Sequence, residues 1–140
     1  MENKARRQNS ELSYFEWEML QKWITQNRIK SLNCAYSVRV GEGANTESVK
    51  EVWLRKLIRH NTQLKIDCVK NDHSGTPEII EVKKVAGPGA IGQLMCYKKL
   101  HDEEYGTEST MTLLCRFASN TILKLCDHFG IKVETLGTYN

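Results

Sequence analysis

The chain has 140 residues, of which 40% are hydrophobic and 26% charged, with a formal net charge of +3. This length suits a single globular domain, and the charge permits a nucleic-acid partner without requiring one. No apolar run approaches the roughly 18 residues of a membrane span, and the polar N-terminus lacks the apolar stretch of a secretory signal. We therefore expect a soluble, intracellular (cytoplasmic) protein.

The hydrophobic periodicity changes several times along the chain, which indicates a mixture of helices and strands. In chain order we predict a helix over 13–28, a strand over 31–40, a helix over 47–60, strands over 62–70 and 77–85, a helix over 89–104, a strand over 111–118, a helix over 119–129 and a strand over 131–136. This order predicts an α/β domain with a mixed sheet of about five strands flanked by helices. Residues 1–12 are expected to form a flexible tail, and 13–42 to add the first helix and strand to a core over 43–140.

Local signals support several of these boundaries. Ser13 followed three residues later by Glu16 is typical of a capping box, and Thr46 is a candidate N-cap for the second helix. The turn formers NDHSGT predict that the strands on either side form a hairpin. The second helix is expected to turn its apolar residues toward the core, namely Val49, Val52, Trp53, Leu57 and Ile58.

The five cysteines stand singly in apolar segments, without a Cys-x-x-Cys pair. We interpret them as buried free thiols in a reducing compartment. The four histidines lie far in the sequence from any cysteine pair, so no zinc site is expected.

The hairpin is expected to bring two carboxylates together. Alternation along a strand places Glu81 and Lys83 on one side, and in a hairpin symmetric about Ser74, Asp67 lies directly across from Glu81. Like charges in that position destabilise a sheet unless something positive lies between them, and oxygen ligands on a rigid scaffold suit Mg²⁺ or Mn²⁺. The alternative is a solvated strand face that carries an ordinary acid and base pair.

The helix after the hairpin adds two more candidates. Gln93 and Tyr97 lie one turn apart on one helix face, where both side chains can point at the strand end or at a ligand phosphate. An amphipathic boundary between core and solvent is the alternative.

In order and spacing, these residues resemble the PD-(D/E)XK nuclease superfamily, in particular its RecB-like branch. The motifs that carry the resemblance are Asp67, Glu81-Val82-Lys83 and Gln93-Leu-Met-Cys-Tyr97. The resemblance implies a restriction-endonuclease-like core and metal-dependent hydrolysis of DNA phosphodiester bonds, by exonuclease or structure-specific endonuclease action.

The segment before the hairpin resembles the first-helix signature of the family, with Gly43 four residues before Glu47. Glu47 stands where RecB-like enzymes commonly have His, which is similar to archaeal Holliday-junction resolvases, and Glu51 one turn later is the alternative. No Pro precedes Asp67, unlike the pattern that names the family. The cysteine triplet that holds an iron–sulfur cluster in some RecB-like nucleases is absent, so no cluster is expected.

The resemblance assigns a role to each matching residue. Catalysis would use Asp67, Glu81 and Lys83; the metal would be held by Asp67, Glu81, the Val82 carbonyl and Glu47; and Gln93, Tyr97 and Lys84 would support the site or contact DNA. Further contacts to the DNA backbone, or simply a solvated face, would come from Lys50, Arg55, Lys56, Arg59, Lys98 and Lys99.

Two alternatives to the nuclease and one assembly state complete the expectations. A catalytically inactive nuclease-fold protein could bind nucleic acid or serve in an assembly, and a plain α/β interaction module could show the same spacing by coincidence. A homodimer is expected, through apolar surface from Phe15, Trp17 and Trp23 on the first helix.

Overall fold

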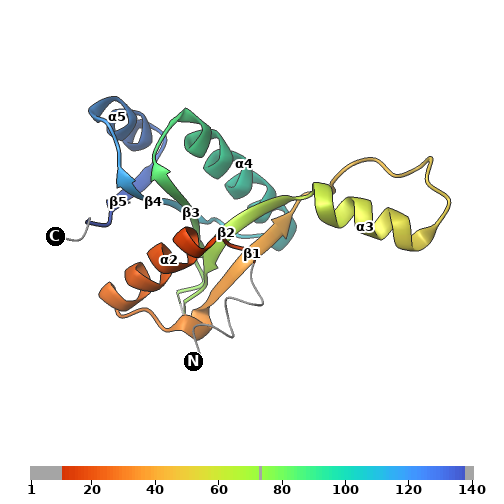
Figure 1. The fold of residues 1–140 in the computed structure, drawn as a ribbon, viewed down its shortest axis with the longest axis horizontal. Helices are drawn as coiled ribbons and strands as arrows, with labels where there is room; N and C mark the ends of the chain where they lie inside the picture. Colours follow the sequence, from red (N-terminus) through yellow and green to blue (C-terminus); the bar gives the residue numbers. More distant parts are fainter. Residues whose placement is uncertain (1–10, 73, 138–140) are drawn as a thin grey trace.

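The computed structural model describes residues 11–72 and 74–137, and its elements follow the predicted order (Figure 1). They are α2 (Tyr14–Gln26), the 3-10 helix η1 (Ser31–Asn33), β1 (Cys34–Val40), α3 (Val52–Thr62), β2 (Leu64–Lys70), β3 (Glu78–Val85), α4 (Pro88–Tyr105), β4 (Thr110–Phe117), α5 (Asn120–His128) and β5 (Ile131–Thr135). No helix within these ranges is both long and apolar enough to span a bilayer.

The strands form one sheet in the order β1-β2-β3-β4-β5. β1, β2 and β3 are antiparallel neighbours, whereas β3, β4 and β5 run parallel. The parallel strands are joined by α4 and α5, because a parallel connection has to cross back over the sheet. The predicted mixed sheet of about five strands is confirmed.

Helices cover both faces of this sheet and create two apolar layers. On one face α4 and α5 contribute Leu94 and Ile122, and on the other α2 contributes Leu20. Ile79 points into the first layer and its neighbour Ile80 into the second, as alternation along a strand requires. The buried strands are therefore apolar on both faces, and a buried charge on them stands out.

The first helix begins at the predicted capping box. Ser13 Oγ accepts a hydrogen bond from the Glu16 backbone N–H at 3.2 Å and donates to Glu16 Oε1 at 2.9 Å. Trp17 and Trp23 on this helix are 4% and 2% exposed, because they pack on the sheet. The expectation that both form an exposed dimer interface is wrong, and the homodimer itself stays a prediction.

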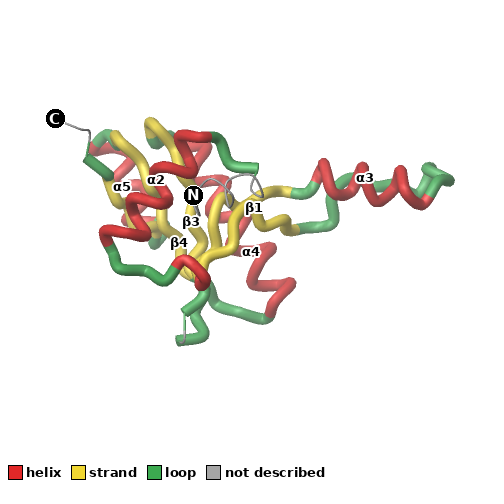
Figure 2. Tube along the Cα trace, turned by 60° about the horizontal axis from the view of Figure 1, so that its bottom comes forward, coloured by secondary structure: helices red, strands yellow, loops and turns green. Residues whose placement is uncertain are grey.

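The second helix differs most from the expectation. α3 begins at Val52 rather than 47, none of its residues is buried, and Trp53 is 67% exposed. Figures 1 and 2 show why: α3 projects beyond the sheet at the end of β1 and β2. Thr46 does not cap it, since this buried side chain instead accepts a hydrogen bond from Arg59 Nε at 3.2 Å.

The predicted flexible tail falls mostly outside the described residues, which begin at Glu11. Leu12 is buried in the α2 layer, and Glu11 pairs with side chains of the first two strands. Both residues therefore belong to the folded domain. All five cysteines are free thiols, as predicted, but only Cys68, Cys115 and Cys126 are buried. Cys34 is partly buried and Cys96 is exposed on α4, so the expectation that all five are buried is wrong.

Candidate active site

The hairpin has the register that its turn predicts. β2 pairs with β3 at Lys70–Glu78, Val69–Ile79 and Cys68–Ile80. One further step in this register places Asp67 opposite Glu81. At that step the Asp67 side chain takes over from the backbone, because its Oδ2 accepts a hydrogen bond from the Val82 N–H at 2.8 Å. The acid therefore bridges the point where the two strands separate.

The strand is irregular at this acid. Ile66 packs in the α4 layer and Cys68 in the α2 layer, although residues two apart on a regular strand share one face. On β1, Ser37 stands opposite Asp67 in the register and has a φ of 52°, which is uncommon for a residue other than glycine. Departures of this kind cluster at functional sites.

An open cavity of about 330 Å³ forms beside the irregular point. It is lined by Glu11, Leu12, Glu16, Ser37, Gln63, Leu64, Lys65, Asp67, Glu81, Gln93 and Tyr97. Four residues of the predicted site, from β2, β3 and α4, thus share one cavity.

The remaining polar groups are arranged around the two acids. Lys83 Nζ lies 3.7 Å from Glu81 Oε1, so this pair shares one side of β3. On α4, Gln93 Nε2 donates to the Tyr97 hydroxyl at 3.4 Å. The predicted acid, base, amide and phenol are therefore in one place, with the lysine ammonium partly exposed and Glu81 buried.

The two acids oppose each other electrostatically. Burial raises the pKa of Glu81, and the nearby charge of Asp67 raises it further. Burial likewise raises the pKa of Asp67, although the Val82 N–H favours the charged form. Glu81 Oε2 is buried and makes no hydrogen bond with the described residues. A buried carboxylate oxygen without a partner is costly, and a cation is one group that would remove this cost.

Glu16 also lies at the candidate site, although no motif in the sequence marks it as a site residue. It lies in the first turn of α2, lines the same cavity, and its charge raises the pKa of both Asp67 and Glu81. In the sequence it was recognised only as the partner of Ser13 in the capping box. Nothing local in the sequence places this helix end over β2 and β3.

Five of the predicted residues do not line this cavity, namely Glu47, Glu51, Val82, Lys83 and Lys84. Glu47 is exposed on the loop before α3 and lines a different cavity, of about 580 Å³, with Asn45 and Arg59. The resemblance placed it at the metal because sequence spacing carries no information on where α3 projects. Glu51, the alternative metal ligand, is also exposed and directly precedes α3. Lys84 is exposed and, by alternation, faces away from Lys83.

Several of the bases expected at DNA are already engaged within the protein. Arg55 Nη2 donates to the Lys50 carbonyl at 3.0 Å. Lys98 and Lys99 on α4 form ion pairs with Asp102 and Glu103 at 2.9 and 2.8 Å. These contacts favour the solvated-face interpretation for the lysines of α4.

The donor set fits a hard divalent cation with few protein ligands. In the described part of the chain, no group of three or more His, Cys, Asp or Glu side chains is close enough to hold a metal ion. Mg²⁺, however, is commonly bound by one or two carboxylates together with water and substrate phosphate. Asp67 and Glu81, with the unpartnered Glu81 Oε2, provide this minimal set.

Comparison with known proteins identifies the fold. No protein-family model and no curated protein matches the sequence. The match to a repair endonuclease from Pyrococcus abyssi covers 91% of this chain and 48% of that protein's chain, with 20% sequence identity and a TM-score of 0.53. The match to EndoMS in complex with dsDNA covers 94% of this chain and 48% of the EndoMS chain, with 17% sequence identity and a TM-score of 0.54. The chain thus spans about half the length of these proteins, and its α/β domain has a restriction-endonuclease-like core.

Proposed function

We propose that this chain is a metal-dependent deoxyribonuclease of the RecB-like branch of the PD-(D/E)XK superfamily, which hydrolyses phosphodiester bonds with Mg²⁺ or Mn²⁺. The observation that carries the proposal is the buried pair Asp67 and Glu81, in which Glu81 Oε2 has no hydrogen-bond partner among the described residues. The likeness to a repair endonuclease and to EndoMS bound to dsDNA supports DNA as the substrate. The Gln93 and Tyr97 pair supports the RecB-like branch.

The negative charge of the carboxylate pair has to be balanced before both acids can act as metal ligands. Two acids side by side in a partly dry site cannot both be charged without a cation between them. Asp67 is already fixed by the Val82 N–H, and Glu81 by its place inside β3, so both oxygens are held in position before anything binds. A divalent cation held by these two acids would polarise the phosphate and lower the pKa of the attacking water.

The other side chains suit the remaining tasks. Lys83 carries its ammonium at the side of Glu81 and is 36% exposed, so it can reach the attacking water or neutralise charge on the phosphate. The Tyr97 hydroxyl and the Gln93 amide lie on the α4 side of the cavity, where they can donate hydrogen bonds to phosphate oxygens.

One observation favours the inactive alternative, a nuclease-fold protein that binds DNA or serves in an assembly. No group of three metal-ligating side chains is gathered in the described part of the chain. This alternative predicts DNA binding that metals do not convert into cleavage.

The test is incubation of the protein with linear, circular and single-stranded DNA, in Mg²⁺, in Mn²⁺ and in EDTA. We expect cleavage in either metal and none in EDTA, and loss of covalently closed circles would identify endonuclease action. Glu81→Gln should lower the rate by orders of magnitude, whereas Glu103→Gln, an exposed acid on α4, should not. Absence of cleavage for every DNA form, or full activity of folded Glu81→Gln, would remove the proposal.

A further inference from the structure

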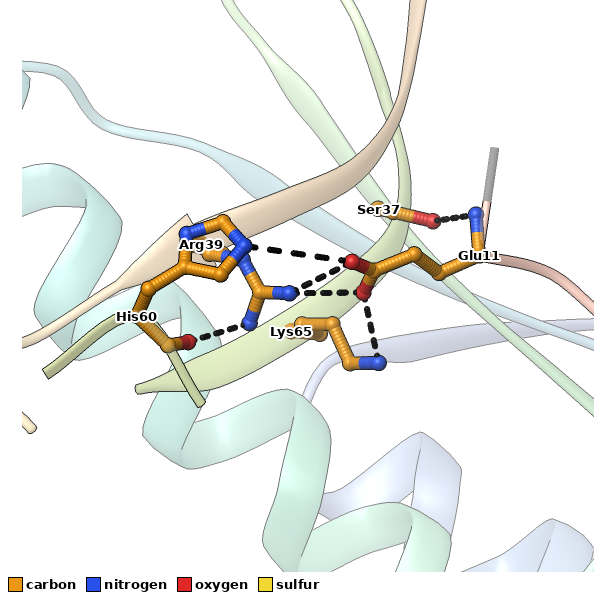
Figure 3. A network of polar contacts seen from close by, with 5 residues as sticks. All are labelled: Glu11, Ser37, Arg39, His60 and Lys65. Carbon is orange, nitrogen blue, oxygen red and sulfur yellow. Dashed lines mark hydrogen bonds and ion pairs between the residues drawn. The ribbon is translucent and has the colours of Figure 1, made fainter. Parts of the chain in front are cut away.

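A second charged cluster (Figure 3) includes Glu11 and Lys65, which line the same cavity. The carboxylate of Glu11 is held by the Arg39 guanidinium, with Nη2 at 2.6 Å from Oε1 and 2.7 Å from Oε2. Lys65 Nζ lies 2.7 Å from Oε2, and His60 Nε2 lies 3.9 Å from Oε1. Basic side chains from three parts of the chain thus converge on one carboxylate.

Two bases of the cluster lie on β1 and on β2, the strand that also holds Asp67. Arg39 lies on β1 and Lys65 on β2, two residues before Asp67. Arg39 is positioned by its own contact, since Nη1 donates to the His60 carbonyl at 2.6 Å, and only 14% of its side chain is exposed. Lys65 lines the same cavity as Asp67 and Glu81, so this base of the cluster faces the same space as the acids.

Glu11, in contrast, is loosely supported. It precedes α2, lies outside any helix or strand, and 46% of its side chain is exposed. Besides the basic side chains, its backbone N–H donates to Ser37 Oγ at 3.1 Å. The bases therefore belong to the sheet and the end of α3, whereas the anion they hold belongs to a connecting segment.

The geometry of this cluster suits another anion equally well. A phosphodiester carries one negative charge on two non-bridging oxygens, as a carboxylate does, and the arginine fork binds both in the same two-oxygen manner. An ammonium such as that of Lys65 is an ordinary phosphate ligand. The exposed carboxylate of Glu11 can leave to water, where its charge is well solvated.

We infer that Arg39, Lys65 and His60 form a subsite for a DNA backbone phosphate beside the position of cleavage, and that Glu11 occupies this subsite in the free protein. The inference rests on the proposed function for the identity of the anion. When DNA binds, its phosphate replaces the Glu11 carboxylate. The segment before α2 therefore competes with the substrate and weakens its binding.

The test measures binding alone, by fluorescence anisotropy of a labelled duplex in EDTA, so that no cleavage occurs. Glu11→Gln keeps the shape of the side chain and removes its charge. We expect tighter binding, with the slope of log affinity against log salt steeper by about 1, because in the wild type the displaced Glu11 carboxylate takes up a counterion that offsets the one released from the phosphate. Glu18→Gln is the matched control, since it changes the net charge equally from an exposed position on α2.

A second pair of variants tests the same subsite from the other side. Lys65→Gln should weaken binding and flatten the salt slope by about 1. Lys124→Gln, exposed on α5 near the opposite edge of the sheet, should leave both unchanged apart from the small effect of net charge. This pair decides the matter if thermal melting finds that Glu11→Gln unfolds.

The outcomes separate this inference from the nuclease proposal. Tighter binding by Glu11→Gln in a protein that cleaves nothing would support the subsite and remove the nuclease. Cleavage by the wild type, with Glu11→Gln binding like Glu18→Gln, would remove the subsite and leave the nuclease. Equal binding by Lys65→Gln and Lys124→Gln would also overturn the subsite.

Discussion

Glu16 in the first turn of α2 and Asp67 in β2 line one cavity, although one belongs to a helix cap and the other to a strand. Ser13 holds one oxygen of Glu16 at 2.9 Å, so the capping bond also fixes an acid of the candidate site. The residue that caps α2 therefore also positions a carboxylate beside Asp67 of the hairpin.

This link gives the first prediction. Glu16→Gln should raise the Mn²⁺ concentration needed for half-maximal cleavage, because a negative charge near the cation is lost. Ser13→Ala should lower the free energy of unfolding by about 1 kcal/mol, and, because it releases the Glu16 carboxylate without removing its charge, it should raise the Mn²⁺ requirement by less than Glu16→Gln does. Metal titration of the cleavage rate and urea denaturation measure the two effects. An unchanged Mn²⁺ requirement in Glu16→Gln would exclude Glu16 from the site.

Lys83 and Lys84 form a natural pair for a second prediction. Lys83→Ala should lower the cleavage rate by about 10²- to 10³-fold, because its ammonium is the cation beside Glu81. Metal binding should survive, since neither Asp67 nor Glu81 changes. Lys84→Ala removes an equal charge from an exposed position on the other side of β3 and should leave the rate nearly unchanged. Equal losses in both variants would assign the effect to net charge.

The third prediction concerns acid stability. Asp102 is partly desolvated, but its contacts with Lys98, Ser109 and Thr107 outweigh this and lower its pKa to about 2. A group whose folded pKa is depressed stabilises the fold above its unfolded pKa, and this stability is lost as pH falls through the folded pKa. We expect Asp102→Asn to lose about 1 to 2 kcal/mol relative to wild type at pH 6 and less than about 0.5 kcal/mol near pH 2. Urea denaturation at both pH values measures the difference, and a constant difference would contradict the assignment.

The tryptophans give the fourth prediction. Trp23 on α2 is only 2% exposed, because it packs against the sheet, whereas Trp53 on α3 is 67% exposed. Trp23→Ala should therefore lower the free energy of unfolding by about 3 to 5 kcal/mol. Trp53→Ala should change it by less than about 0.5 kcal/mol. A large loss in Trp53→Ala would mean that α3 packs against another surface in solution.

The sequence predicted what depends on neighbours along the chain. The turn around Ser74 sets the register of the hairpin, so the meeting of Asp67 and Glu81 followed from counting residues. The one-turn spacing of Gln93 and Tyr97 likewise predicted their contact. Both relationships are local, since each is fixed by a single turn or helix.

What the sequence did not predict depends on packing between distant segments. The apolar pattern of α3 favoured a buried helix, but β1 and β2 extend past the paired part of β3 and leave no sheet beneath it. Because Glu47 lies on the loop before this helix, its expected place beside Asp67 and Glu81 was wrong as well. The positions of Glu16 and Glu11 depend on how α2 lies across the sheet, which no spacing within the sequence determines.

The projection of α3 has a mechanical consequence. The helix α3 is joined to the sheet through β1 and β2, and both strands pass the irregular position where Ser37 stands opposite Asp67. Arg39 also bonds the His60 carbonyl at the end of α3. A displacement of α3 would therefore be passed through β1 and β2 to Arg39 and Lys65, and would shift these bases relative to Glu81 on β3.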